Sequence, residues 1–269
     1  MDTVPISPRS LYSRFGSPAS PLIVDVRRDA AFEKDPRLVP AAVRPPGDLV
    51  AFARAHASGR SLVAYCVLGH EVSQEAARTL SRAGYETAYL EGGIEAWLAE
   101  GLPTIRPRPD WHVPGGSRWI TRERPKIDRI ACPWLIQRFI DPLARFDYVP
   151  KERVFDEAEK RAAVPYDIPG AVVTHRAERC SFDALIEDFA LHDPALDLLA
   201  TIVRGADTDR LDLAPQCAGL VATSLGLSKR FTNDHEMLAN ALPVYDGLYA
   251  WCRAQCEGDT ERHNWSPVL

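Results

Sequence analysis

The sequence lacks an apolar run long enough to cross a membrane. A membrane-spanning helix needs about 20 consecutive, mostly apolar residues, and no window of the 269 residues approaches that length. The first sixteen residues, MDTVPISPRSLYSRFG, also lack the apolar stretch and the small-residue cleavage pattern of a secretory signal. We therefore expect a cytoplasmic protein that makes no membrane contact.

Closely spaced cysteine pairs of the CxxC type are absent as well. The six cysteines, at positions 66, 132, 180, 217, 252 and 256, are scattered along a chain long enough to be stable without disulfide bonds. We therefore expect reduced thiols rather than a disulfide framework. Cys252 and Cys256 lie four residues apart on a predicted helix, a spacing that can hold a metal ion but more often does not.

An excess of positive charge is also missing. The net charge of −5 does not favour a general nucleic-acid binder. Residues 1–110 carry as many basic as acidic side chains, so the whole acidic excess lies in the second half. At about 100–200 residues per domain, the length predicts two domains. We place them at 5–105 and 119–256, with a Pro/Gly-rich linker at 106–118 and a tail at 257–269.

Strands and helices alternate through the first half. The buried strands LIVDV (22–26), SLVAY (61–65) and ETAYL (86–90) alternate with helices expected at 48–57, 73–84 and 94–101. This order predicts an α/β domain of three layers, a parallel sheet with helices on both faces. Ser73 is the expected N-cap of the middle helix.

Cys66 lies where a strand ends and a short loop leads into a helix. Ligands of parallel sheets bind at the carboxyl ends of the strands. The backbone N–H groups of the loop and the positive end of the helix lower the pKa of a thiol there and also suit a small oxyanion. The alternative is a buried, inert cysteine. The predicted anion-binding loop consists of Val67, Leu68, Gly69, His70, Glu71, Val72 and Ser73.

The motifs LIVDVR, a strand ending in C-x-x-G, AARTLSRAGY and YLEGGIEAWLAEGLP follow one another in this order. Together they resemble the rhodanese-like family over about residues 5–105. The resemblance implies a sulfurtransferase that carries sulfane sulfur as a persulfide on Cys66. It implies no required cofactor and a small anionic donor such as thiosulfate or a persulfide. Asp25 and Arg27 match the family's Asp-Val-Arg, for which we expect structural hydrogen bonds to neighbouring loops, with Glu91 among the partners.

The loop departs from that family in two ways. Typical loops place Arg five residues after the cysteine, where this chain has Glu71, which repels a dianion unless it points away. The loop is also one residue longer, which suits larger tetrahedral anions, although Val72 stands where a Cys-x5-Arg phosphatase needs Arg. His70 adds a titratable group to the rim. A non-catalytic oxyanion sensor that binds chromate at the same loop is therefore an alternative to the enzyme.

The second half is predicted to be mostly α-helical, with a short strand at RFDYV (145–149). Asp128, Ser181 and Asp193 are the expected helix caps, and Pro243 is expected to kink or interrupt the last helix. Residues 118–129 contain five basic and two acidic side chains. One interpretation of this segment is that it binds a nucleic acid or another partner. A charged stretch exposed to solvent explains it equally well.

Four motifs of this half resemble the C-terminal domain of the ChrB-type chromate-resistance family over about residues 118–253. They are TRERPKIDRIACPWLIQRFIDPLARF, THRAERCSFDALIEDFAL, IVRGADTDRLDLAPQCAGL and LPVYDGLYAW. The resemblance implies a role in chromate resistance or chromate sensing.

His175, Asp207 and Asp246 are candidate metal ligands of the second half, because histidine and carboxylates bind zinc, iron or manganese. Their spacing is no local motif, so only the fold can bring them together. Helix caps and a hydrogen-bonded core histidine are the ordinary alternatives. A metal-dependent enzyme in the second half is thus a third functional hypothesis.

Overall fold

Five parallel strands form the sheet of the N-terminal half in the computed structural model, which describes residues 4–111 and 115–259. Their order across the sheet is β1-β5-β4-β2-β3, and every neighbouring pair is parallel. The strands are β1 (Val4–Ile6), β2 (Leu22–Asp25), β3 (Ala42–Val43), β4 (Leu62–Tyr65) and β5 (Thr87–Leu90). The predicted parallel α/β architecture is confirmed.

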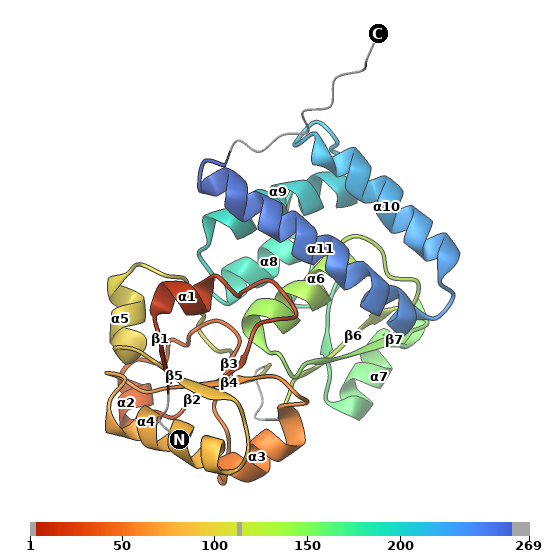
Figure 1. Ribbon diagram of the computed structural model, residues 1–269. Helices are drawn as coiled ribbons and strands as arrows, with labels where there is room; N and C mark the ends of the chain where they lie inside the picture. The colour runs from red at the N-terminus through yellow and green to blue at the C-terminus, as the bar shows by residue number, and fades with distance from the viewer. Residues whose placement is uncertain (1–3, 112–114, 260–269) are drawn as a thin grey trace.

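Alternate residues of the central strands supply two separate cores, as the two-residue period of a strand requires. Leu22, Val24, Leu62 and Ala64 face one way and pack under α3 (Leu49–His56) and α4 (Glu71–Arg82). The opposite face of the sheet packs against α1 (Pro8–Tyr12) and α5 (Gly93–Ala99). The short α2 (Asp29–Lys34) follows β2. Figure 1 shows α3 and α4 on the side of the sheet away from the C-terminal half.

Helix α4 begins at Glu71, two residues before the predicted start, and His70 occupies its N-cap position. The prediction that Ser73 caps this helix is therefore wrong. Ser73 lies within the first turn, fully buried, where its hydroxyl oxygen lies 3.2 Å from the Cys66 sulfur and 3.3 Å from the His70 carbonyl oxygen. The hydroxyl thus serves the loop rather than the helix end.

The C-terminal half is mostly helical, as predicted, and also holds a second, three-stranded parallel sheet of order β7-β6-β8. Its strands are β6 (Arg118–Arg122), β7 (Arg145–Val149) and β8 (Val164–Pro165). Strand β7 was expected and β6 was not. Helix α6 (Asp128–Leu135) passes into a π-helical turn (Ile136–Ile140), and a 3-10 turn (Lys151–Arg153) leads into α7 (Val154–Arg161). The remaining helices are α8 (Ser181–Asp188), α9 (Pro194–Asp207), α10 (Gln216–Arg230) and α11 (Asp234–Cys256).

Two of the predicted caps are wrong in a way that matters for the chemistry of this half. Asp128 is the first residue of α6, but its carboxylate accepts hydrogen bonds from the backbone N–H groups of Ser181 and Phe182, at the start of α8. Cys180, not Ser181, is the N-cap of α8. Asp193 caps α9 as expected, whereas Pro243 lies inside α11, which continues without interruption.

Most of the basic side chains of segment 118–129 have partners inside the domain. Arg118 pairs with Asp147 and Arg129 with Asp167. Arg124 donates hydrogen bonds to the carbonyls of Ser228 and Phe231, at the end of α10. Burial and the positive charges of its neighbours, first among them Arg129 and Arg124, lower the pKa of Lys126, so an excess of positive charge remains at this point.

The two halves pack against each other through one continuous core. Phe15 lies 6.0 Å from Phe139 between ring centroids, and the Ala41 amide donates to the Phe139 carbonyl at 2.7 Å. The hydroxyl of Tyr12 donates to Asp193 at 2.7 Å across the same boundary. Part of the predicted linker also packs, since the Arg106 amide donates to the Phe189 carbonyl at 2.8 Å. Residues 112–114 of that linker, and the predicted tail from residue 260, lie outside the described residues.

Among residues 4–111 and 115–259, no helix combines the length and the apolar character that crossing a bilayer requires.

Candidate functional site

Cys66 follows directly after β4, at the carboxyl edge of the sheet, and lines a cavity of about 420 Å³. The residue itself is buried, and its Sγ lies 3.2 Å from the hydroxyl oxygen of Ser73 in α4. The cavity is lined by Arg27, Arg28, Ala31, Cys66, Val67, Leu68, His70, Glu71 and Val72. The thiol is therefore enclosed by its own loop on one side and by the segment after β2 on the other.

Hydrogen bonds around the sulfur favour its thiolate form. Burial by itself raises the pKa of the Cys66 thiol, because it removes water from a charged sulfur. The Ser73 hydroxyl and the nearby backbone amides more than offset this effect, so the net pKa is lowered. The amides that contribute are those of Ser73, His70 and Leu68. The lowering of the Cys66 pKa that the position of the loop predicts is therefore present, and the donors that cause it are neutral.

Two glycines allow the loop and α5 to approach each other closely. Both Gly69 and Gly93 have positive φ, at 68° and 61°. A Cβ on Gly93 would lie 2.5 Å from the Cys66 carbonyl oxygen, and a Cβ on Gly69 would lie 2.5 Å from the Leu90 carbonyl oxygen. Without side chains there, the Ile94 amide donates to the Cys66 carbonyl at 3.0 Å. The first turn of α5 therefore fixes the backbone of the loop that carries Cys66.

The rim of the cavity is apolar on one side and charged on the other. Leu68 and Val72 are exposed, at 52% and 37%. Glu71 is exposed and lines the cavity, which puts a carboxylate at the edge of the space that an anionic ligand would occupy. Arg28 lines the same cavity, is exposed, and has no ion-pair partner within the described part of the chain. Among the described residues that line the cavity, Arg28 is the arginine without an ion-pair partner, and the sequence alone did not single it out.

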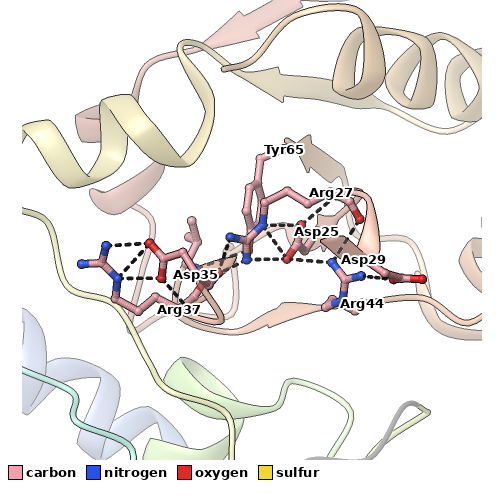
Figure 2. A network of polar contacts seen from close by, with 8 residues as sticks. Asp25, Arg27, Asp29, Asp35, Arg37, Arg44 and Tyr65 are labelled. Carbon is pink, nitrogen blue, oxygen red and sulfur yellow. Dashed lines mark hydrogen bonds and ion pairs between the residues drawn. The ribbon is translucent and has the colours of Figure 1, made fainter. Parts of the chain in front are cut away.

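Asp25 and Arg27 are structural, as expected, although Glu91 is not among their partners. Both side chains are almost fully buried, and the Arg27 guanidinium lies 2.7 Å from an Asp25 carboxylate oxygen. Arg27 also donates to the backbone carbonyls of Asp35 and Arg37, and Arg44 lies 3.3 Å from Asp25 (Figure 2). Since Asp25 pairs in register with Tyr65, the network ties the end of β2 to the residue before Cys66.

The structure brings only two of the three predicted metal ligands together. His175 and Asp207 lie 3.1 Å apart. Asp246 belongs elsewhere, because its carboxylate accepts hydrogen bonds from Trp134 Nε1 at 2.7 Å and from Arg138 at 2.8 Å. Two aspartates that the sequence did not single out as ligands, Asp128 and Asp167, lie beside His175 instead.

Replacing Ser73 with alanine tests the electrostatics around Cys66. The change removes a hydrogen bond to the thiolate but little volume, so we expect the Cys66 pKa to rise and the fold to survive. The rate of alkylation by iodoacetamide, measured against pH, should then reach its midpoint at a higher pH. Ser81→Ala, on the same helix and away from the thiol, serves as the control. Identical pH profiles for Ser73→Ala and the unmodified protein would contradict the assignment.

Two family models match the chain. The model described as "Rhodanese-like domain" matches residues 7–100. The model described as "ChrB, C-terminal domain" matches residues 119–252. The two matches therefore fall on the two halves of the molecule and leave the packed connection between them unassigned.

Individual relatives divide in the same way. Protein ChrB of Cupriavidus metallidurans is 35% identical over 174 residues, which are 63% of this chain and 52% of that protein. The chain thus spans about half the length of this relative. A sulfurtransferase of Allochromatium vinosum is 32% identical over 104 residues, 38% of this chain and 94% of that protein. Among solved structures, a rhodanese-related protein from Thermoplasma volcanium has 23% identity and a TM-score of 0.31, covering 39% of this chain and 99% of its own.

Proposed function

The chain belongs to the rhodanese-like family over residues 7–100 and to the ChrB C-terminal domain family over residues 119–252, and on this basis we propose that it is a sulfurtransferase associated with chromate resistance. In this proposal Cys66 carries the transferred sulfur as a persulfide. The observation that supports it most directly is the hydrogen-bonded, pKa-lowered thiol in an accessible cavity.

The reaction takes two displacements at sulfur. The Cys66 thiolate attacks the outer sulfur of thiosulfate, the sulfur–sulfur bond of the donor breaks, and sulfite leaves with the electron pair. The persulfide anion that forms on Cys66 is held by the same hydroxyl and amides that hold the thiolate. A cyanide or thiolate acceptor then attacks the terminal sulfur, and the Cys66 thiolate is released. This is covalent catalysis by an activated nucleophile.

The neutral donors of the loop explain how such a site works without the Arg that typical loops carry at position 71. Backbone N–H groups and a hydroxyl stabilise the anion, and helix α4 begins at the loop with its positive end. Thiocyanate formation from thiosulfate and cyanide by the purified chain tests the proposal. A chain that forms no thiocyanate with thiosulfate or with a persulfide donor would contradict it.

Arg28 is expected to attract the anionic donor to this cavity. Arg28→Ala should raise KM for thiosulfate about three- to five-fold and leave kcat nearly unchanged, because an exposed charge contributes below about 1 kcal/mol. The effect should shrink at high salt, since exposed charges are screened. Arg54→Ala, an exposed arginine of α3 outside the cavity, is the matched control. A kcat loss without a KM change would instead show that Arg28 does not act by attraction.

A second candidate function at the same loop is chromate binding without sulfur transfer. The observation that favours it is that Glu71 stands where typical loops carry Arg, so the loop departs from the usual sulfurtransferase site while its backbone N–H groups still suit a tetrahedral dianion. Titration of chromate against the protein and its Cys66→Ala variant separates the two functions. Tight chromate binding that survives in the variant, together with no thiocyanate formation, would favour the sensor.

A further inference from the structure

A second cluster of reactive side chains lies in the C-terminal half, apart from Cys66. The Nε2 atom of His175 lies 3.1 Å from Asp207 Oδ2, 3.4 Å from Asp167 Oδ1 and 3.6 Å from Asp128 Oδ2. These residues come from four segments. Asp128 opens α6, Asp167 follows β8, His175 precedes α8, and Asp207 ends α9.

We propose that this cluster is a binding site for a divalent transition-metal ion, with Asp128, His175 and Asp207 as ligands and the Asp167 carboxylate beside them. One ligand atom from each of the three residues lies within 4.8 Å of the others. One imidazole nitrogen and several carboxylate oxygens, without a thiolate, suit Zn²⁺, Mn²⁺ or Fe²⁺. The site is independent of the sulfur chemistry proposed for Cys66.

The distances from His175 Nε2 to the carboxylate oxygens are close to those between neighbouring ligand atoms of a coordination shell. Metal–ligand distances of about 2.0–2.2 Å place neighbouring atoms of a tetrahedral shell about 3.3–3.6 Å apart. The distances from His175 Nε2 to the three carboxylate oxygens are 3.1, 3.4 and 3.6 Å. A single imidazole N–H can direct a good hydrogen bond to one oxygen only. Three oxygens gathered around one nitrogen therefore fit a shared cation better than a shared proton.

Each carboxylate is held from behind, as ligands of metal sites usually are. Asp128 accepts hydrogen bonds from the Ser181 amide at 2.6 Å and the Phe182 amide at 3.0 Å. Asp167 accepts one from the Ser181 hydroxyl at 2.9 Å. Asp207 accepts one from the Asp128 amide at 3.4 Å. These contacts fix the oxygens before any ion arrives, which lowers the cost of ordering a site on binding.

The charge of the cluster also calls for a cation. Three carboxylates gather where Asp128 is fully buried, and Arg129 and Arg122, 3.3 Å and 3.9 Å from Asp167, supply two permanent positive charges, one fewer than the carboxylates. A divalent cation would offset this remaining negative charge, since buried charges are paired or coordinate metals.

One side of the cluster is open to solvent. The side chain of His175 is 39% exposed and that of Asp207 is 19% exposed, whereas that of Asp128 is 0% exposed. An ion can therefore enter, and its outer position is left to water or a small anion.

Metal content of the full chain tests this inference. The protein is stripped with a chelator, incubated separately with Zn²⁺, Mn²⁺ and Fe²⁺, desalted, and measured by mass spectrometry of the metal. We expect about one equivalent of at least one of these ions per chain. His175→Ala and Asp207→Asn should each weaken the affinity at least about ten-fold, as loss of a ligand-shell group does. Their melting curves without metal show whether the variants are folded.

Asp209→Asn is the matched control for Asp207→Asn. It removes the same charge two residues away, from an exposed position whose φ of 58° asparagine tolerates. The control should bind as the unmodified protein does. Retention of none of the three ions by the unmodified protein, or unchanged binding by folded His175→Ala, would overturn the inference. Thiocyanate formation is measured on the metal-free protein as well. A failure of the proposed metal site can then be told apart from a failure of the proposed sulfurtransferase activity.

Discussion

Cys66→Ala is expected to reduce thiocyanate formation from thiosulfate by about three orders of magnitude or more. Removal of the nucleophile of a covalent mechanism leaves only the binding contribution of the remaining site. The side chain is small and the loop around it is fixed by backbone hydrogen bonds to α5, so the fold should survive the change. The measurement is kcat/KM for thiosulfate, with the melting temperature as a check on folding.

Cys256→Ala is the matched control, because Cys256 is the exposed cysteine of the described chain. Burial raises the pKa of the thiols of Cys132, Cys180, Cys252 and Cys256. These thiols are therefore poor nucleophiles at neutral pH, and the control should keep full activity. Activity above about a tenth of normal in a folded Cys66→Ala variant would contradict the assignment of Cys66 as the sulfur carrier.

Asp25→Asn should have the largest effect on stability. The change keeps the volume but leaves the Arg27 guanidinium, with a side chain only 1% exposed, without its charged partner. Removal of one member of a buried ion pair costs about 3–5 kcal/mol of unfolding free energy. Two carbonyls of the loop at residues 35–37 depend on the same guanidinium, so that loop should loosen as well. Chemical denaturation of the full chain measures the loss.

Asp29→Asn gives the comparison for this effect. Asp29 pairs with Arg44 at 2.8 Å, but its side chain is 90% exposed. An exposed pair contributes about 1 kcal/mol or less. The two variants remove the same charge from the same stretch of chain. The difference between their losses of unfolding free energy therefore measures the effect of burying the ion pair. Equal losses of stability would show that the network around Asp25 is not what holds the end of β2 in place.

Much of the Cys66 site is readable from the sequence because it is local. The strand, the cysteine, the loop and the helix follow one another within about twenty residues, and hydrophobic pattern and glycine positions locate each of them. The error in the start of α4 came from Ser73, whose residue type is typical of an N-cap. Its hydroxyl contacts the Cys66 thiol instead. The preference of serine for N-cap positions does not indicate such a contact.

The His175 cluster shows where sequence reasoning stops. Its four members are up to 79 residues apart, between Asp128 and Asp207, and no periodic pattern links them. Asp246 has the same residue type and a similar sequence context, yet Arg138 and Trp134 occupy its carboxylate. Strand β6 was not predicted for a related reason. It begins and ends with arginine, so its sequence pattern does not indicate that Trp119, Ile120 and Thr121 between them are buried. Tertiary packing decides such cases, and packing is not local.

The most direct test of the central claim is the mass of the Cys66 peptide after the protein has reacted with thiosulfate and before any acceptor is added. Digestion without reductant, followed by mass spectrometry, should show the mass of one added sulfur atom on this peptide. Cyanide should then remove it with the release of thiocyanate. A Cys66 peptide of unchanged mass in a preparation that still forms thiocyanate, or the added sulfur on another cysteine, would contradict the account.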